Sequence, residues 1–425
     1  MAVATLLVNK VTNMNPINIM SSKARSVGAG NNVESGFYNW TLPTNIETPI
    51  TLSAGIPDAD SMPVQDLQNE LNSVLDTFRN ESLRYGGIQG FLGLRTALAT
   101  KYTLEENHAY NSEQFLIENG SAGCIDLICD AFIEPGDVVL VEGPTFSGSS
   151  RTIQGHQAEI IQITLDDHGI LMDEIISVAH KIHNQGKRIK MLYTVCDFQN
   201  PTGTVLAAAR RAELIDFCHS NQILILEDSA YSDIYFSSPP PPSLFSMARG
   251  YGVLRVGTFS KILATGLRIG WIQGHLDFIN VLTQVKFDMG NSPLIQRALA
   301  AYMETEKLNI HLETIRTIYH RKCQILADTL TKHCSEYFRF SKPDGGFYLW
   351  IRCLQDFQAS KIRELASSKG ILFPLGSSFY INSDKDDDKH LRLAFSNASI
   401  TDLESVGPIL ESVCKELIMS DHRSL

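Results

Sequence analysis

The strongest constraint on the fold is a regular alternation of apolar strands and amphipathic helices that begins near residue 115. We predict helices at 124–133, 172–183 and 206–220, and strands at 115–118, 138–142, 160–165, 190–194, 223–227 and 254–256. Apolar strands that are separated by such helices predict a mostly parallel sheet with both faces covered. Ligands of these sheets bind beyond the carboxyl ends of the strands, so chemistry is expected there.

The segments on either side of this region predict a second, smaller unit. We expect an N-terminal arm at 1–50, a first part of the small domain at 51–80, a large domain at 81–300 and a C-terminal small domain at 301–425. Residues 64–78 predict a helix, a long helical stretch covers about 275–335, and the charged segment 384–389 predicts a solvated loop. The expected fold class is therefore α/β, with a large sheet domain and a smaller α+β domain.

Composition excludes several classes of function. A net charge of −11 argues against nucleic-acid binding, which needs a basic surface. No apolar run approaches the roughly 20 residues of a membrane span. The eight cysteines include no C-x-x-C pair, which predicts reduced thiols, no metal site and a cytoplasmic location. Residues 1–33 contain basic but no acidic side chains, so a mitochondrial transit peptide is the alternative to an arm belonging to the fold.

The loop Gly257–Trp271 contains the best candidate for a nucleophile. Lys261 follows a predicted strand and lies close in sequence to the hydroxyls of Thr258 and Ser260, with Arg268 further along. A lysine at a strand end can be desolvated and held partly neutral, so that its amine can form an imine. Hydroxyls and a guanidinium beside it suit a phosphate group. The alternative, and the commoner case for a lysine considered alone, is a surface lysine in a turn.

Two further polar groups follow predicted strands. Asn200 opens the turn Asn200-Pro-Thr-Gly203, which by itself indicates only turn chemistry. Asp228 ends the apolar run of the fifth strand, and Tyr231 follows it. A buried carboxylate needs a partner, and a cationic ring nitrogen would supply one, with Tyr231 reaching an oxygen of the same ring. An ordinary hydrogen-bonded network is the alternative.

Three more candidates lie where a ligand could meet them. Ser121 and Ala122 belong to a Gly-rich segment at a predicted helix start, where free N–H groups bind phosphate. Phe146, on a strand-end loop, could stack on a flat ring, and core packing is its alternative. Arg392, on a predicted strand of the small domain, suits a substrate carboxylate, and a structural salt bridge is the competing interpretation.

Taken in order, these residues resemble the fold-type I pyridoxal-phosphate (PLP) enzymes, specifically the class I and II aminotransferases. The resemblance runs from about Leu52 to Arg392 and rests on Tyr85, Gly120-Ser-Ala122, Asn200-Pro-Thr-Gly203, Asp228-x-x-Tyr231, Thr258-x-Ser-Lys261, Arg268 and Arg392. The segment Phe198–Gly203 looks closest to the branch that contains 2-aminoadipate, kynurenine and aromatic aminotransferases. The fold implied is PLP-dependent transferase fold type I, with a mostly parallel, seven-stranded-type sheet.

The resemblance also implies a role for each residue around the cofactor. Lys261 would bind PLP as an imine and move a proton, Asp228 would keep the pyridine nitrogen protonated, and Phe146 would stack on the ring. Asn200 and Tyr231 would hold the ring oxygen. The implied phosphate ligands are Ser121, Ala122, Thr258, Ser260 and Arg268, and no metal is implied.

The remaining implied contacts concern substrate and subunits. Arg392 would bind the substrate α-carboxylate, helped by backbone near Gly55 and by Asn200. Tyr85 would reach the phosphate of the neighbouring subunit, which implies a homodimer with shared sites. Two residues depart from the pattern: Cys196 stands where this branch commonly has proline, and Leu375 stands where proline usually precedes glycine. The second departure puts the substrate preference in doubt.

Three functions compete at this stage. The first is an aminotransferase that exchanges an amino group between an L-amino acid, aromatic or 2-aminoadipate by analogy, and a 2-oxo acid. The second is another PLP reaction, such as a C–S or C–C lyase or a decarboxylase, because the cofactor residues are shared. The third is a non-catalytic, regulator-type module, which would require a basic DNA-binding segment that the acidic chain does not present.

Overall fold

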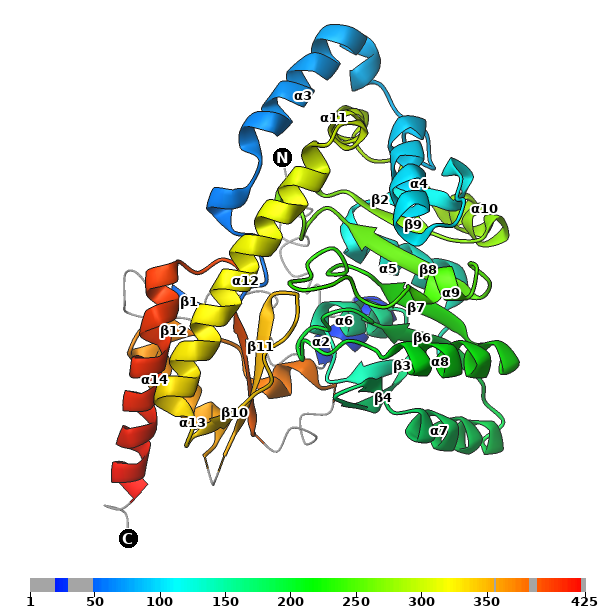
Figure 1. Cartoon of the computed structure of the whole chain (residues 1–425). Helices are drawn as coiled ribbons and strands as arrows, with labels where there is room; N and C mark the ends of the chain where they lie inside the picture. The colour runs from blue at the N-terminus through cyan, green and yellow to red at the C-terminus, as the bar shows by residue number, and fades with distance from the viewer. Residues whose placement is uncertain (1–19, 30–48, 355–356, 382–387, 422–425) are drawn as a thin grey trace, which may run out of the picture.

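The computed structural model describes residues 20–29, 49–354, 357–381 and 388–421 (Figure 1). Most of the N-terminal segment for which an arm or transit peptide was considered, and residues 384–387 of the expected solvated loop, lie outside the described residues. Helix α2 (Ser22–Ala29) is described and packs against α6 (Ser147–Gly155). This part of the N-terminal segment therefore lies against the sheet region.

The central sheet has eight strands in the order β2-β9-β8-β7-β6-β3-β4-β5. Its members are β2 (Phe115–Glu118), β3 (Val138–Gly143), β4 (Glu159–Asp166), β5 (Gly169–Ile170), β6 (Ile189–Thr194), β7 (Leu224–Asp228), β8 (Val253–Thr258) and β9 (Gly270–Gln273). Strands β4, β3, β6, β7 and β8 pair in parallel, whereas β9 runs antiparallel to both of its neighbours. The prediction of a mostly parallel sheet is confirmed, and β5 and β9 are additions to it.

Both faces of the sheet are buried, which explains the near-continuous apolar runs. Along β3, Val138 and Leu140 share one buried cluster with Leu214 of α8 (Ala208–Ser220). Val139 and Val141 share another cluster with residues of α5 (Gly120–Phe132). Because successive side chains of a strand point to opposite faces, α5 and α8 lie on opposite sides of the sheet. Helix α7 (Met172–Asn184) packs against α8.

Helix α5 begins at Gly120, earlier than the predicted start at Cys124. Gly120 has φ +69°, a left-handed value that favours glycine, and this allows the chain to turn directly from β2 into the helix. The apolar periodicity that locates a helix interior carries no information about such a turn. The correction matters because it puts Ser121 and Ala122 in the first turn of the helix.

The predicted helical stretch at about 275–335 consists of three helices rather than one. These are α10 (Leu276–Val285), α11 (Pro293–Glu304) and α12 (Lys307–Cys334). The break before α11 has local causes: Gly290 has φ +85°, Ser292 caps the helix through its hydroxyl, and Pro293 occupies the first turn.

A smaller unit contains the C-terminal elements. Strands β10 (Phe338–Arg339), β11 (Tyr348–Cys353) and β13 (His390–Ala394) form an antiparallel sheet, and β1 (Ile50–Thr51) pairs in parallel with β12 (Ile371–Leu372). Helices α12, α13 (Ala359–Ser368) and α14 (Ile400–Asp421) pack beside them. Segments from both ends of the chain thus meet in one unit.

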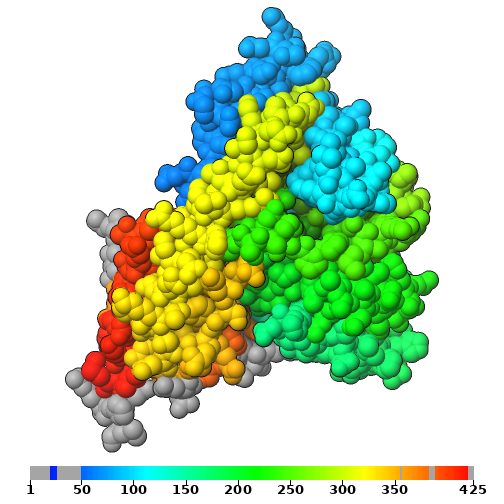
Figure 2. Space-filling view, in the orientation of Figure 1, coloured from blue at the N-terminus to red at the C-terminus, as the bar shows by residue number. Residues whose placement is uncertain are grey.

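Two helices from the first quarter of the chain pack against α11. Helix α3 (Val64–Phe78) packs against α11 and projects at the top of the molecule (Figure 2). Helix α4 (Leu92–Glu106) also packs against α11 and contacts β2.

Three general properties bear on function. All eight cysteines are buried and none forms a disulfide, as the reduced-thiol prediction requires. Within the ranges that the structure describes, no helix has the length and apolar character to cross a membrane. Over the same residues, no group of three or more His, Cys, Asp or Glu side chains is arranged to hold a metal ion.

Candidate active site

Lys261 lies just beyond the carboxyl end of β8, at the edge of the sheet where the loops that follow the parallel strands are found. Its Nζ donates a 2.7 Å hydrogen bond to the carbonyl oxygen of Gly55, which follows β1 and is 206 positions away in the chain. Nζ also lies 5.9 Å from the ring centroid of Tyr231. The lysine therefore sits between the large sheet and the segment that enters from the N-terminal side.

The surroundings of Lys261 favour its neutral form. Burial, followed by the positive charges of Arg392 and Arg268, lowers the pKa of Lys261 from 10.5 to about 8, although Asp228 acts in the opposite direction. Among the described residues no carboxylate lies within 4.0 Å of its Nζ to form an ion pair. At neutral pH an amine with this pKa is a much better nucleophile than an ordinary lysine.

Asp228 is the last residue of β7, and its carboxylate is buried. Its Oδ2 lies 2.9 Å from the Tyr193 hydroxyl, which is also 2.9 Å from the Ser149 Oγ, and its Oδ1 accepts a 3.2 Å hydrogen bond from the Ala230 N–H. Burial raises the pKa of Asp228, while Tyr193 and Ala230 act against that rise. A carboxylate held in this way still gains from a nearby cationic nitrogen.

Asn200 and Tyr231 lie together, as the sequence predicted for two residues that hold one ring oxygen. The group between them is Tyr348 of β11, whose hydroxyl lies 2.9 Å from the Tyr231 hydroxyl and accepts a 3.4 Å hydrogen bond from the Asn200 Nδ2. All three residues are buried. Sequence reasoning missed Tyr348, because an aromatic residue in an apolar strand is indistinguishable from core packing.

Arg392, on β13, is buried but forms no ion pair among the described residues. Its Nη1 donates a 2.9 Å hydrogen bond to the Asn200 Oδ1, its Nη2 donates to the Ser53 carbonyl oxygen, and its Nε has no partner. The Tyr348 and Phe379 rings lie 4.4 and 4.6 Å from its Cζ. Burial lowers the pKa of Arg392. The expected alternative of a structural salt bridge is not found, and a buried cation without a counter-charge suits an anionic ligand.

Backbone and hydroxyl donors gather where β2 and β8 end. The first turn of α5 contains Ser121 and Ala122, and no side chain caps its N–H groups. The Arg268 Nη2 donates a 3.3 Å hydrogen bond to the Asn119 carbonyl oxygen, so its guanidinium lies at the start of this helix. A Cβ on Gly120 would come within 2.9 Å of the same Nη2. The guanidinium and the helix dipole at this position both favour a bound anion.

Thr258 and Ser260 form a compact hydroxyl pair beside this helix start. The Thr258 Oγ1 donates to the Ser260 Oγ at 3.0 Å and accepts from the Ser260 N–H at 3.1 Å. Both residues are buried. Strand β9 lies between β2 and β8, and its first residue, Gly270, pairs with both Glu118 and Thr258, so the α5 start and the hydroxyl pair follow the two strands that flank β9.

Two predicted residues are not drawn into these contacts. Phe146 is the residue before α6, follows the cis Gly143–Pro144 bond, and is partly buried. Tyr85 is 81% exposed in the loop before α4 and touches none of the groups described above. Within one chain, the contacts given above link Lys261, Tyr231, Asn200 and Arg392 and bring Arg268 to the start of α5.

The two departures from the family pattern have different surroundings. The buried Cys196 accepts backbone and side-chain hydrogen bonds at its carbonyl, from the Leu206 N–H at 2.8 Å and the Arg211 Nη2 at 3.3 Å. It is therefore structural. Leu375 precedes the turn Gly376–Phe379, which brings the Phe379 ring against Arg392. The second departure thus adjoins the arginine rather than the lysine.

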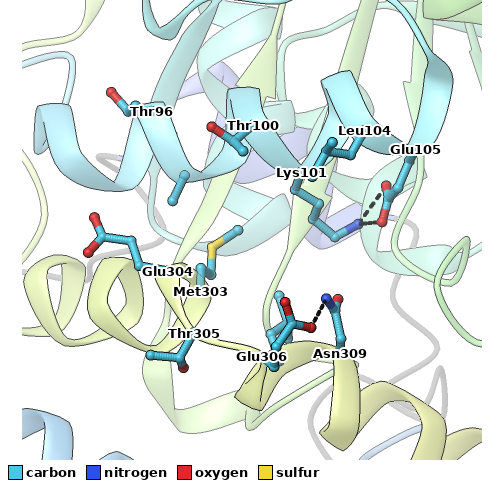
Figure 3. A pocket seen from close by; sticks show the side chains of 12 residues that line it. Thr96, Thr100, Lys101, Leu104, Glu105, Met303, Glu304, Thr305, Glu306 and Asn309 are labelled. Carbon is cyan, nitrogen blue, oxygen red and sulfur yellow. Dashed lines mark hydrogen bonds and ion pairs between the residues drawn. The ribbon is translucent and has the colours of Figure 1, made fainter.

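A separate pocket between α4 and the α11–α12 junction contains another buried lysine (Figure 3). It is about 490 Å³ in volume and is lined by Thr100, Lys101, Glu105, Glu304 and Glu306 among others. The Lys101 Nζ lies 2.7 Å from the Glu105 Oε1 and 3.0 Å from the Asp233 Oδ1. Because its ammonium is paired, Lys101 is not a candidate nucleophile.

An amine that is partly neutral near pH 8 condenses readily with an aldehyde, and the α5 start together with the hydroxyl pair suits a phosphate. Pyridoxal phosphate carries both groups on a pyridine ring, and its nitrogen would meet the buried Asp228. The fold and the site define a PLP-dependent enzyme of fold type I.

The chain belongs to the family described as aminotransferase class I and II, whose model matches residues 47–406. It is a PLP-dependent transaminase, and its substrates are amino acids and 2-oxo acids.

Individual relatives agree with this assignment. The chain is 29% identical over 348 residues to aromatic-amino-acid aminotransferase 1 of Thermococcus litoralis, covering 81% of this chain and 84% of that protein. The crystal structure of the multiple substrate aminotransferase from Thermococcus profundus superposes with a TM-score of 0.86 at 27% identity, covering 96% of this chain and 100% of the other. The predicted fold, cofactor and family branch are confirmed.

Several similar proteins have a regulator's name. The uncharacterized HTH-type transcriptional regulator YdfD of Bacillus subtilis is 29% identical over 370 residues, which cover 87% of this chain and 74% of that protein. The match shows that the same module also occurs within longer proteins.

Proposed function

We propose that Lys261 is the amine that bonds the PLP aldehyde and, when released, the base that takes a proton from the substrate α-carbon. The observation that carries this assignment is the lowered pKa of Lys261, which arises from burial and from Arg392 and Arg268 in the absence of an ion pair. PLP supplies an electron-accepting ring that stabilises negative charge at the substrate carbon. The lysine has to be neutral to attack and neutral again to accept the proton, and a pKa of about 8 serves both requirements.

We assign the remaining cofactor contacts to the residues that the family resemblance implies. Asp228 would hold a proton on the ring nitrogen by electrostatic pairing, and Asn200 and Tyr231 would donate hydrogen bonds to the ring oxygen. Phe146 covers one face of the ring. The phosphate is held by Ser121, Ala122, Thr258, Ser260 and Arg268, which combine backbone N–H groups, hydroxyls and one guanidinium.

Arg392 receives the substrate α-carboxylate. Its guanidinium is buried, has no carboxylate partner in the described chain, and keeps an unpartnered Nε. The Asn200 Oδ1, the Ser53 carbonyl oxygen and the two flanking rings restrict how it can turn, and the backbone near Gly55 would help to bind the carboxylate. Binding a carboxylate here places the α-carbon toward Lys261, since Lys261 donates to the Gly55 carbonyl.

The amino donor is an aromatic amino acid or 2-aminoadipate in our proposal. The support is the resemblance of the segment Phe198–Gly203 to that branch and the similarity to an aromatic-amino-acid aminotransferase. Aromatic rings beside Arg392, contributed by Tyr348 and Phe379, are compatible with a flat or long side chain.

We propose a homodimer in which Tyr85 completes the partner's phosphate site. Tyr85 is 81% exposed, and other apolar side chains near it in sequence or across the Gly87–Gly290 contact are exposed as well: Leu83 at 66%, Phe287 at 87% and Met289 at 46%. An apolar surface of this kind is unfavourable in a monomer. A cytoplasmic location and a division into a large domain at 81–300 and a small domain at 51–80 plus 301–425 complete the proposal.

The decisive experiment is a half-reaction panel. The purified PLP-loaded protein is mixed with single amino acids, and its visible spectrum should shift to that of the amino form of the cofactor, then return when a 2-oxo acid is added. Lys261→Ala should lose the visible band of the loaded protein. Release of ammonia or carbon dioxide without a spectrum that a 2-oxo acid reverses would identify a lyase or a decarboxylase instead.

A further inference from the structure

Tyr348 contacts three polar residues around the proposed ring-oxygen and carboxylate positions, namely Tyr231, Asn200 and Arg392. Its hydroxyl lies 2.9 Å from the Tyr231 hydroxyl and 3.4 Å from the Asn200 Nδ2, and its ring lies 4.4 Å from the Arg392 Cζ. It is 2% exposed. No sequence motif singled it out, and its placement depends entirely on strand β11 of the small sheet.

The packing leaves Tyr348 little freedom. A Cβ on Gly55 would lie 1.7 Å from the Tyr348 hydroxyl oxygen, so the glycine is needed for the tyrosine to occupy this position. The Tyr231 and Tyr348 rings meet edge to face with centroids 5.7 Å apart. On the strand pairing, Trp350 rather than Tyr348 stands opposite Arg392, so the Tyr348 ring reaches the guanidinium diagonally.

We infer that the Tyr348 hydroxyl is a positioning group that directs the Tyr231 and Asn200 protons toward the cofactor ring oxygen, while its ring holds the Arg392 guanidinium in place. This inference rests on the proposed function. A phenol can donate only one proton, so if Tyr231 donates to a ring oxygen, its own oxygen is left to accept the proton of Tyr348. A donor that accepts a hydrogen bond itself becomes a stronger donor.

The direction of the effect follows from charge. Hydrogen bonds to an anionic ring oxygen stabilise its negative charge, and they do so most when the adjacent imine nitrogen has lost its proton. The Tyr348 hydroxyl therefore lowers the pH at which the PLP-loaded protein loses that proton. Removing the hydroxyl should raise this pH.

Tyr348→Phe tests the hydroxyl while keeping the ring. The pH midpoint of the visible absorbance change of the PLP-loaded protein should rise by about 0.3–1 unit, the change expected for loss of one neutral hydrogen bond. The KM for the amino acid should stay within about twofold, because the ring still covers Arg392. Tyr348→Leu removes the ring as well, so its KM should rise severalfold in addition.

Tyr302→Phe is the matched control, because Tyr302 is equally buried and its hydroxyl donates only to the Lys307 carbonyl oxygen at 3.4 Å. Its midpoint should equal that of the wild type. An unshifted or lowered midpoint in Tyr348→Phe, with a normal band in the wild type, overturns the inference and leaves the proposed function intact. If the wild type shows no pH-dependent visible band at all, the assignment of Lys261 fails, and this inference fails with it.

Discussion

Lys101 and Lys261 are both largely removed from solvent, but their electrostatic surroundings are opposite. Burial works against the ammonium of Lys101, but Asp233 and Glu105 outweigh it and raise the pKa of Lys101 above its ordinary value. Burial also works against the ammonium of Lys261, and there Arg392 and Arg268 reinforce it, so the pKa falls to about 8. Burial alone thus does not make a lysine reactive, because the charges that remain in contact with it determine which protonation state is favoured.

The largest expected difference between the two lysines is in activity. Lys261→Ala should reduce transamination by on the order of 10³-fold or more, because the amine that bonds the cofactor and moves the proton is lost. Lys101→Ala, assayed at a temperature where it is folded, should retain kcat within a few-fold. Both rates are measured with the amino donor found in the half-reaction panel. Equal losses of activity in the two variants would mean that Lys261 is not the reactive lysine.

The next largest expected effect is the loss of folding stability when Lys101 is replaced. Lys101→Met leaves Asp233 and Glu105 without their cation, so the free energy of unfolding should fall by about 3–5 kcal/mol in denaturant titrations. Lys187→Met is the control, since Lys187 pairs with Glu159 at the surface and its side chain is 47% exposed. That exposed pair should contribute less than about 1 kcal/mol.

Replacing Lys261 should have the opposite effect on stability from replacing Lys101. Its pKa is about 8 in the folded chain and 10.5 in the unfolded one, so the unfolded state binds more protons between these values and native stability rises with pH across that window. Lys261→Met should therefore stabilise the cofactor-free protein by roughly 1–3 kcal/mol at pH 7. The advantage should shrink as pH rises from 8 toward 10.5. A gain that does not depend on pH would show that packing, and not the charge, is responsible.

The smallest expected effect tests one of the cations beside Lys261. In the cofactor-free protein, Arg268→Gln should raise the pKa of Lys261 by about 0.3 unit, because an exposed guanidinium is well screened. The pH dependence of chemical modification at Lys261, read by peptide mass spectrometry, measures this value. Arg249→Gln, which changes an exposed arginine of another loop, should leave it unchanged.

The sequence predicted the large sheet well because its strands are buried on both faces and produce unbroken apolar runs. Strand β9 (Gly270–Gln273) was not predicted, because it begins at a glycine and directly follows a loop whose glycines and arginine dominate the local pattern. The two-residue β5 carries even less signal.

The residues of the site also differ in whether the sequence could predict them. Lys261, Asp228, Asn200 and Arg392 were predicted because each is a polar residue on, or in the loop after, an apolar strand, and because together they resemble the family pattern. Tyr348 was not, because its function depends on a hydroxyl at the end of a ring that packs like any core aromatic. Long-range pairing between β11 and β13 brings it beside Arg392, and no local pattern records that pairing.

The pairing of β1 with β12 has a consequence for the order in which the protein assembles. Ile50 lies opposite Ile371, so the ends of a very long loop have to meet before this pair forms, at an entropic disadvantage that grows with loop length. All strands of the central sheet lie between residues 115 and 273, so during synthesis they are available long before Ile371 and Arg392 leave the ribosome. The residues proposed to bind phosphate can therefore fold together early in synthesis. Arg392, which is proposed to bind the substrate carboxylate, joins them only when synthesis is almost complete.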